Sequence, residues 1–134
     1  MLTISCEDKY TKKELKDLFL SVGWAKDMTE EQLFLAMKNS THYVTARMDG
    51  ILVGFVRSMD DEIWSANIDC MVVHGNYQRQ GIGTAMLRTL VDVLSGIHYI
   101  SVMPNSPNSV PIYLKCGFSL IEGGQLLQQN RWED

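Results

Sequence analysis

Near the start of the chain, apolar and polar residues repeat with the period of a helix in two consecutive stretches. Each stretch, residues 11–21 and 29–39, opens on a threonine that has Glu or Gln three residues later. This arrangement is a capping box, in which the two side chains satisfy free amides at a helix start. We therefore predict two consecutive helices, preceded by a short strand over the β-branched residues 2–6.

The middle of the chain has the period of strands. Residues 42–48 and 51–58 flank Asp49-Gly50, a two-residue signal for a tight hairpin. Residues 63–73 alternate and then become continuously apolar, as in a strand that enters a core. Three adjacent strands are the prediction.

After this strand the period returns to that of a helix, from Gly81 to a stop at Gly96. The rest of the chain predicts a strand, a short helix and a final hairpin about Gly123-Gly124, over residues 97–103, 109–115, 118–122 and 125–131.

Together these elements predict an α+β fold. We expect a mixed, mainly antiparallel sheet of about seven strands with helices on both faces. The order is strand, two helices, three strands, helix, strand, helix and two strands. Because the chain has 134 residues and 46% hydrophobic content, we expect residues 1–134 to form a single domain with one core.

Charge and cysteine content exclude several classes of function. The chain has 12 basic and 16 acidic residues and no basic cluster, which argues against nucleic acid as a partner. Three cysteines without a CxxC pair and three scattered histidines predict neither a disulfide framework nor a metal site. No apolar run has the length of a signal peptide or membrane span, so we expect a cytoplasmic protein without a membrane partner.

The sharpest local signal is the segment 73–84, VHGNYQRQGIGT, where a buried strand leads through a polar loop into a helix that starts among glycines. Glycines let the backbone approach a ligand, and the first amides of a helix attract anions such as phosphate. Neither a GxGxxG fingerprint nor a P-loop is present. A bare glycine pair also suits a tight turn without a ligand, so the surrounding residues have to decide.

Those residues carry a family resemblance. The pattern Gln78-x-x-Gly81-x-Gly83, after a strand ending in VV, resembles the acetyl-CoA motif of the GNAT superfamily of N-acetyltransferases. The later block YLKCGF, from Tyr113, is similar to the Y-x-x-x-G-F signature of that superfamily. The resemblance covers residues 42–122. Within the superfamily, VGW at positions 22–24 and YQRQGIG in the turn are similar to a bacterial and plastid group.

The resemblance implies acetyl-CoA as cofactor. Backbone amides from Arg79 to Thr84 would hold its pyrophosphate, with Gln78 bracing the turn, and the strand would separate from its neighbour at a bulge. The exposed backbone of Met71 and Val73 would then pair with the pantetheine arm. The cofactor-binding residues expected in this way are Met71, Val72, Val73, Gln78, Arg79, Gln80, Gly81, Ile82, Gly83, Thr84, Asn105, Asn108 and Tyr113.

Two positions depart from the family pattern. Gly75 stands where the family often has proline, and Ser106 stands where it has a helix-starting asparagine. Either Asn105 or Asn108 would take the pantetheine contact, and the choice between them stays open.

Acetyl transfer to an amine needs three groups besides the cofactor. A base must remove the amine proton, because an alkyl ammonium has a pKa of about 10. Asp69 is our candidate, with Glu62 or a water relay as alternatives, although Asp69 also fits an outward-facing carboxylate that keeps the strand soluble. The resemblance places Tyr113 beside the thioester sulfur as proton donor, and the amide of Val73 would meet the oxyanion. Direct attack in a ternary complex needs no cysteine nucleophile.

The acceptor would be recognised by Trp24, Glu62 and Trp64, because aromatic faces and acidic side chains attract amines. We expect a small-molecule primary amine. A protein N-terminus or lysine is an alternative acceptor, and a non-catalytic acyl-CoA-sensing module of the same fold is an alternative function. The acyl length and the oligomeric state stay open, a homodimer through the last strand included.

Overall fold

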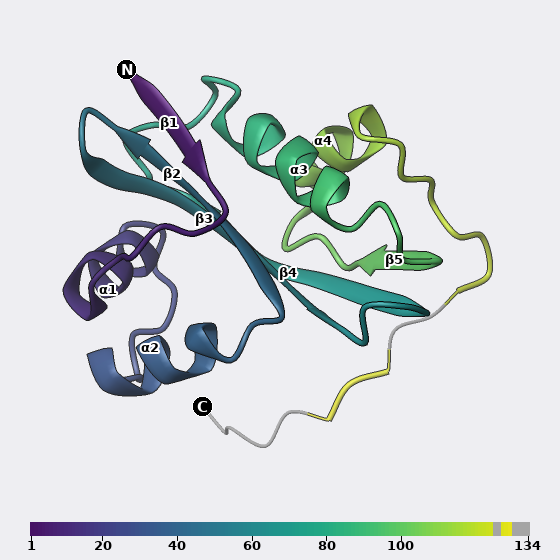
Figure 1. Ribbon diagram of the computed structural model, residues 1–134, viewed down its shortest axis with the longest axis horizontal. Coiled ribbons are helices and arrows are strands. Elements are labelled where there is room, and N and C mark those ends of the chain that lie inside the picture. Colours follow the sequence, from purple (N-terminus) through teal and green to yellow (C-terminus); the bar gives the residue numbers. More distant parts are fainter. Residues whose placement is uncertain (125–126, 130–134) are drawn as a thin grey trace.

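The computed structural model describes residues 1–124 and 127–129, in which five strands form one sheet in the order β1-β2-β3-β4-β5 (Figure 1). The first four strands are antiparallel, and β5 pairs parallel to β4. The mixed, mainly antiparallel sheet is therefore confirmed. The strands are β1 (Leu2–Ser5), β2 (His42–Met48), β3 (Ile51–Asp60), β4 (Ser65–Val73) and β5 (Tyr99–Val102).

Helices cover both faces of the sheet, as predicted. One face carries α1 and α2, and the other carries α3 and α4, which follows a 3₁₀ turn, η1 (Figure 1). The helical elements are α1 (Lys12–Leu20), α2 (Glu30–Lys38), α3 (Ile82–Val93), η1 (Pro107–Ser109) and α4 (Val110–Lys115). None of the helices in the described part of the chain is both long and apolar enough to cross a membrane.

The local signals of the sequence form as expected. Thr11 and Thr29 cap α1 and α2, and both capping boxes are complete. Asp49 and Gly50 have positive φ angles of 52° and 87°, as the turn between β2 and β3 requires.

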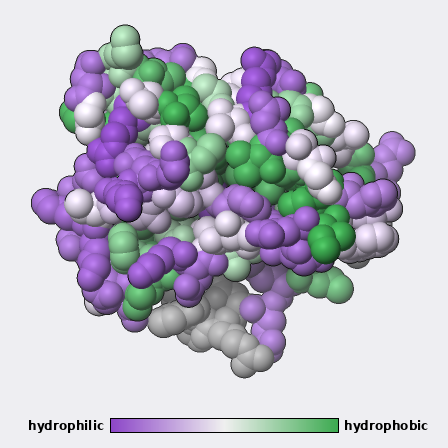
Figure 2. Space-filling model, viewed as in Figure 1, coloured by the Kyte–Doolittle hydropathy of each residue, from purple (hydrophilic) through white to green (hydrophobic). Residues whose placement is uncertain are grey.

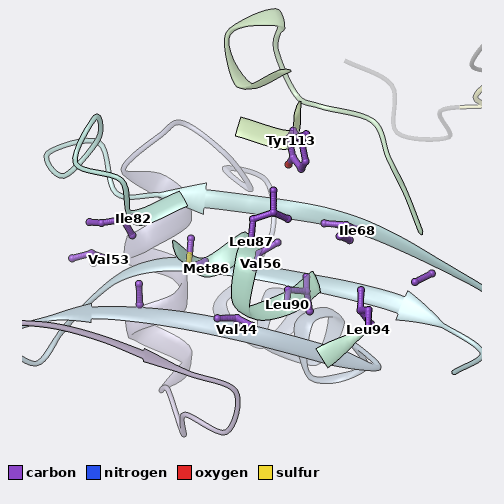
Figure 3. Close-up of a cluster of buried hydrophobic side chains, with 12 residues drawn as sticks. Val44, Val53, Val56, Ile68, Ile82, Met86, Leu87, Leu90, Leu94 and Tyr113 are labelled. Atoms are coloured by element: carbon purple, nitrogen blue, oxygen red, sulfur yellow. The ribbon is translucent and has the colours of Figure 1, made fainter. Parts of the chain in front are cut away.

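Two hydrophobic clusters lie on opposite faces of the sheet, because successive side chains of a strand point to opposite sides. The cluster under α3 includes Val44, Val56 and Ile68, and Figure 3 shows these side chains gathered with Met86, Leu87 and Leu90 of the helix. The cluster under α1 and α2 includes Phe55 and Val72. The sheet is thus fixed between two cores.

A bulge interrupts β4 where the family resemblance predicts it. Phe55 pairs with Val72 and Arg57 with Asp69, so Cys70 and Met71 together oppose a single residue of β3. Cys70 has a positive φ of 55°. The pairing of β4 with β5 ends at Ile68 and Val102. Beyond this point the two strands have no shared ladder, and the edge of β4 is free to meet a ligand.

The predicted count of about seven strands is wrong for the described residues. Residues 118–122 form no strand, and 127–129 lie outside any strand. Positions 125–126 and 130–131 of the expected last strand fall outside the described residues. Leu120 and Ile121 are 73% and 80% exposed. Since neighbours along a strand point to opposite faces, a strand here would leave one of these two side chains away from the core.

Hydrophobic surface gathers on the side of α3, α4 and β5 in the space-filling view (Figure 2). The exposed apolar side chains of this region include Tyr99, Met103, Leu114, Leu120 and Ile121.

Candidate functional site

A cleft of about 690 Å³ opens where β4 and β5 separate, between the start of α3 and α4. Both sequence blocks of the resemblance meet there, although about thirty residues of chain separate them. The expected cofactor-binding residues that line the cleft are Met71, Val73, Gln78, Arg79, Gly81, Ile82, Gly83, Thr84, Asn105, Asn108 and Tyr113.

Two expected residues do not line the cleft. Val72 is buried in the cluster under α1 and α2, because its side chain points opposite to those of Met71 and Val73. Gln80 is exposed on the loop. Any contact of Val72 with a bound cofactor would therefore involve its backbone.

Sequence reasoning gave no role to five residues of the cleft wall: Tyr77, Ser106, Ser109, Ile112 and Lys115. Ser106 caps the 3₁₀ turn, and its Oγ accepts a hydrogen bond from the Asn108 amide at 3.2 Å. Lys115 follows Tyr113 by two residues, and a cation next to the second block of the resemblance was a usable signal for an anionic ligand. Asn105 and Asn108 both line the cleft, so the choice between them stays open.

The start of α3 has the features of an anion site. Gly81 is the N-cap residue, with a φ of 80°, and no side chain of the described residues caps this end. Arg79 also has a positive φ, 65°. The amides of Ile82, Gly83 and Thr84 have no carbonyl partner within the helix, and they lie at the positive end of the helix dipole. These groups can hold a phosphate or pyrophosphate.

The end of β4 presents an amide to the same cleft. The amide of His74 donates to the carbonyl oxygen of Val53 at 2.8 Å. Because successive amides of a strand point to opposite edges, the amide of Val73 points away from β3 and toward the gap. Gln78 braces this turn, since its Nε2 donates to the carbonyl oxygen of Val73 at 3.0 Å.

Tyr113 stands on α4 at the wall of the cleft. Its side chain belongs to the cluster under α3 (Figure 3) and meets the ring of Phe118 edge-on at 5.7 Å. Burial raises the pKa of the Tyr113 phenol to about 12. The phenol is therefore protonated near neutral pH and is a proton donor rather than a base.

Asp69 lies directly before the bulge, on the face of α1 and α2. Arg57 Nε donates to its Oδ1 at 2.7 Å, and Arg57 Nη1 donates to the carbonyl oxygen of Ala36 in α2 at 3.0 Å. The Asp69 side chain is 39% exposed. It is close in sequence to the cleft residue Met71, but it does not line the cleft itself.

The neighbouring thiol is unsuited to nucleophilic catalysis. Burial raises the pKa of Cys70 to about 12, so its reactive thiolate form is scarce at neutral pH.

The structure does not bring Glu62 and Trp64 to the cleft. Both precede β4, whereas the cleft lies at the other end of that strand. Trp64 stacks on His98 with ring centroids 5.5 Å apart. Trp24, the third residue expected to bind the acceptor, does line the cleft.

One group of side chains in the described part of the chain has the spacing of a metal site: His42, Asp60 and Glu62. Asp60 Oδ2 already accepts hydrogen bonds from Ser58 Oγ at 2.7 Å and from His42 Nδ1 at 2.9 Å. Its Oδ1 accepts from the Glu62 amide at 3.0 Å. We therefore interpret the group as a cluster of hydrogen bonds that joins the start of β2 to the end of β3.

A helix start with free amides, a bulged strand end and a buried tyrosine surround one cleft, which is the arrangement that the GNAT resemblance implies. The family model described as the acetyltransferase (GNAT) family matches residues 9–118. The chain therefore belongs to the GNAT family, whose members transfer acetyl groups and generally use acetyl-CoA.

Among curated proteins, the chain is 30% identical over 110 residues to an uncharacterized N-acetyltransferase, ycf52, of Pyropia yezoensis. The match covers 78% of this chain and 63% of that protein. A similar match, 29% identical, is to ycf52 of Porphyra purpurea. The chain thus spans less than two thirds of the length of these relatives.

Solved structures share the fold. A GNAT family acetyltransferase of Streptococcus pneumoniae TIGR4 superimposes with a TM-score of 0.82 at 23% identity, over 98% of this chain and 100% of that chain. The ribosomal-protein-S18-alanine N-acetyltransferase of Escherichia coli superimposes with a TM-score of 0.70 at 20% identity, over 89% and 78% of the two chains.

Proposed function

We propose that this protein is an acetyl-CoA-dependent N-acetyltransferase that transfers acetyl directly to a primary amine. The observation that carries the proposal is the convergence of three features on one cleft: the uncapped start of α3, the free edge of β4 and the Tyr113 phenol. The sensing-module alternative explains the first two features but gives no role to a proton donor at the cleft wall.

The residues of the cleft fit this cofactor. The amides of Ile82, Gly83 and Thr84 and the left-handed Arg79 would hold the pyrophosphate, and Lys115 adds a positive charge. The free edge of β4 beyond Ile68 would pair with the amide groups of the pantetheine arm. Acetyl-CoA would supply the acetyl group as a thioester.

Three groups of this chain would manage the proton and charge changes. Asp69, directly or through a water molecule, accepts the proton that the amine loses as its nitrogen bonds to the carbonyl carbon. The Val73 amide donates to the carbonyl oxygen while negative charge develops there. The Tyr113 phenol gives its proton to the thiolate as the carbon–sulfur bond breaks. Solvent then removes the proton from Asp69 and returns a proton to the Tyr113 phenolate.

The acceptor is proposed to be a small-molecule primary amine, with a protein N-terminus as the second candidate. The names of two structural neighbours support testing other acceptor classes. One is a ribosomal-protein-S18-alanine N-acetyltransferase, and another is a glucosamine-6-phosphate N-acetyltransferase of Arabidopsis thaliana. The homodimer expected from the resemblance stays a prediction.

The first test is a thermal shift of the purified protein with acetyl-CoA, coenzyme A, NAD and ATP. We expect acetyl-CoA and coenzyme A alone to stabilise the protein, by roughly 2.7 kcal/mol at about 100 times the dissociation constant. The Gly83→Trp variant should lose the response, because Gly83 lines the cleft and a Cβ there already meets the side chains of Val73 and Ile112 at 3.6 and 3.7 Å, so a larger side chain must enter the cleft.

Turnover is tested by thiol release with spermidine, tyramine, glucosamine-6-phosphate and an alanyl peptide as acceptors. Release that depends on one of these amines supports the enzyme. Cofactor binding without release from any amine favours the sensing module, and a folded protein that ignores millimolar acetyl-CoA refutes both.

A further inference from the structure

Trp24 reaches the cleft from the face of the sheet opposite to α3. Its indole lines the cleft together with Met71, Val73 and Tyr113. The same side chain packs against the hydrophobic cluster under α1 and α2, and its ring meets that of Phe19 at 5.9 Å. The pyrophosphate site, by contrast, belongs to α3 on the other face. The indole therefore closes the cleft on the side away from that helix.

The loop that carries Trp24 is held at several points. The Trp24 amide donates to the carbonyl oxygen of Phe19 at 3.0 Å. The Lys16 ammonium donates to the carbonyl oxygens of Ala25 and Met28, on the far side of the tryptophan. Ala25 has a positive φ of 59°. An indole anchored in this way cannot move aside without breaking these contacts.

The same loop is joined to the end of β4. The Gly75 amide donates to Ser21 Oγ at 3.1 Å, and a Cβ at position 75 would come within 2.9 Å of the Ser21 carbonyl oxygen. Glycine therefore permits a contact here that proline, with no amide hydrogen and a ring, would prevent. Gly75 lies two residues beyond Val73, so the contact fixes the loop next to the amide assigned to the thioester carbonyl.

We propose that Trp24 is the residue that limits the length of the acyl group. The inference rests on the proposed function, because it takes the Val73 amide as the position of the carbonyl. Val73 and Trp24 line the same cleft, so an acyl chain that lengthens from the Val73 amide toward the loop would meet an indole that packs against Phe19, on a loop that Lys16 holds. The affinity for an apolar chain usually rises with each added methylene. An affinity that falls as the acyl chain lengthens therefore indicates a steric block.

The test is calorimetric titration of the wild type, Trp24→Ala and Trp64→Ala with acetyl-CoA, hexanoyl-CoA and coenzyme A. Trp64 is a matched control, because it is 61% exposed and lies away from the cleft. We expect wild type and Trp64→Ala to bind hexanoyl-CoA about tenfold more weakly than acetyl-CoA. For Trp24→Ala, the dissociation constants of acetyl-CoA and hexanoyl-CoA should lie within about threefold of each other.

A Trp24→Ala protein that keeps the wild-type discrimination overturns the inference, and so does a wild type that binds hexanoyl-CoA as tightly as acetyl-CoA. If the wild type and the Trp64 variant bind no acyl-CoA, the proposed function itself fails, and this result is visible without the Trp24 variant. If Trp24→Ala does not fold, Trp24→Phe takes its place, because a smaller ring still packs against Phe19. For Trp24→Phe, the ratio of the hexanoyl-CoA to the acetyl-CoA dissociation constant should lie between the ratios expected for the wild type and Trp24→Ala. A ratio equal to that of the wild type overturns the inference.

Discussion

At the scale of single residues, Tyr113 carries the most specific chemistry. Its ring packs against Phe118 in the cluster under α3, and the residue also lines the cleft, so substitution by phenylalanine separates packing from proton donation. Tyr113→Phe keeps the ring contact with Phe118 and removes only the proton donor. We expect the turnover number to fall by about 10²–10³ while the dissociation constant of acetyl-CoA stays unchanged.

Stopped-assay thiol release and calorimetry measure the two quantities for Tyr113→Phe. Because burial raises the pKa of Tyr113 to about 12, we also expect no loss of activity from this group at neutral or mildly alkaline pH. Full activity of Tyr113→Phe would show that solvent protonates the thiolate.

Asp69 is the candidate base, although its side chain lies outside the cleft. It is fixed by Arg57 and stands beside the bulge, but it does not line the cleft. If it is the base, Asp69→Asn should lose about 100-fold in turnover, because the amide accepts no proton. Glu62→Gln, at the far end of β4, is the matched control and should behave as wild type. Equal activities of the two variants would favour a water relay that does not involve Asp69.

At the scale of elements, the junction between the loop after α1 and the end of β4 depends on one glycine. Gly75→Ala places a Cβ 2.9 Å from the Ser21 carbonyl oxygen, so the loop must shift. We expect the free energy of unfolding to fall by about 1–3 kcal/mol and the affinity for acetyl-CoA to weaken. Urea unfolding and calorimetry measure these effects.

The control for Gly75→Ala is Gly96→Ala, since a Cβ at position 96 meets nothing within 4 Å. That variant should unfold within about 0.5 kcal/mol of wild type. A comparable loss in both variants would show that the contact with Ser21 is not the cause, since Gly96 has no such contact and a lower backbone entropy of the unfolded chain would stabilise both variants.

The start of α1 makes the stability depend on pH. Glu14 belongs to the capping box and accepts hydrogen bonds from Arg47 at 2.7 and 3.0 Å. The Arg47 hydrogen bond lowers the pKa of Glu14 from its ordinary value of 4.5 to about 2. A carboxyl with a depressed pKa in the folded state stabilises the protein above its unfolded pKa. This contribution is lost as the pH falls from 4.5 toward 2.

Glu14→Gln should therefore destabilise the protein at pH 7 by about 1 kcal/mol, allowing for the partial exposure of the pair, and much less at pH 3. Urea unfolding at the two pH values measures the difference. Because glutamine can keep the capping hydrogen bond, as Gln32 does in α2, the same loss at both pH values would show that the charge of the carboxylate is not its source.

At the scale of the whole molecule, the cleft depends on how α3 packs against the sheet. A Cβ on Gly54 would lie 2.7 Å from the Met86 sulfur, so the helix approaches the sheet closely at that point. Leu87, on the same helix, is fully buried. Leu87→Ala should cost about 2–5 kcal/mol in the free energy of unfolding.

Leu35→Ala, at a 49% exposed position of α2, is the matched control and should cost under about 0.5 kcal/mol. Equal losses in urea unfolding would contradict the burial of Leu87 in the cluster under α3.

The sequence by itself determined the features that depend on neighbouring residues. The capping boxes of Thr11 and Thr29, the turn at Asp49-Gly50 and the glycine start of α3 are local, because each involves partners within four residues or a backbone angle. The order of the elements along the chain followed from these signals, and the two motifs of the cleft from the resemblance.

Only the tertiary structure decided which distant residues meet. Packing of the first helix brought Trp24 to the cleft, pairing across β3 and β4 joined Arg57 to Asp69, and the direction of β4 left Glu62 and Trp64 at the other end. The expected final hairpin was wrong over residues 118–122 because a strand needs a partner and a face to bury, which a local pattern cannot supply. Long-range contacts depend on the register and packing of the whole sheet, which no single segment of the sequence determines.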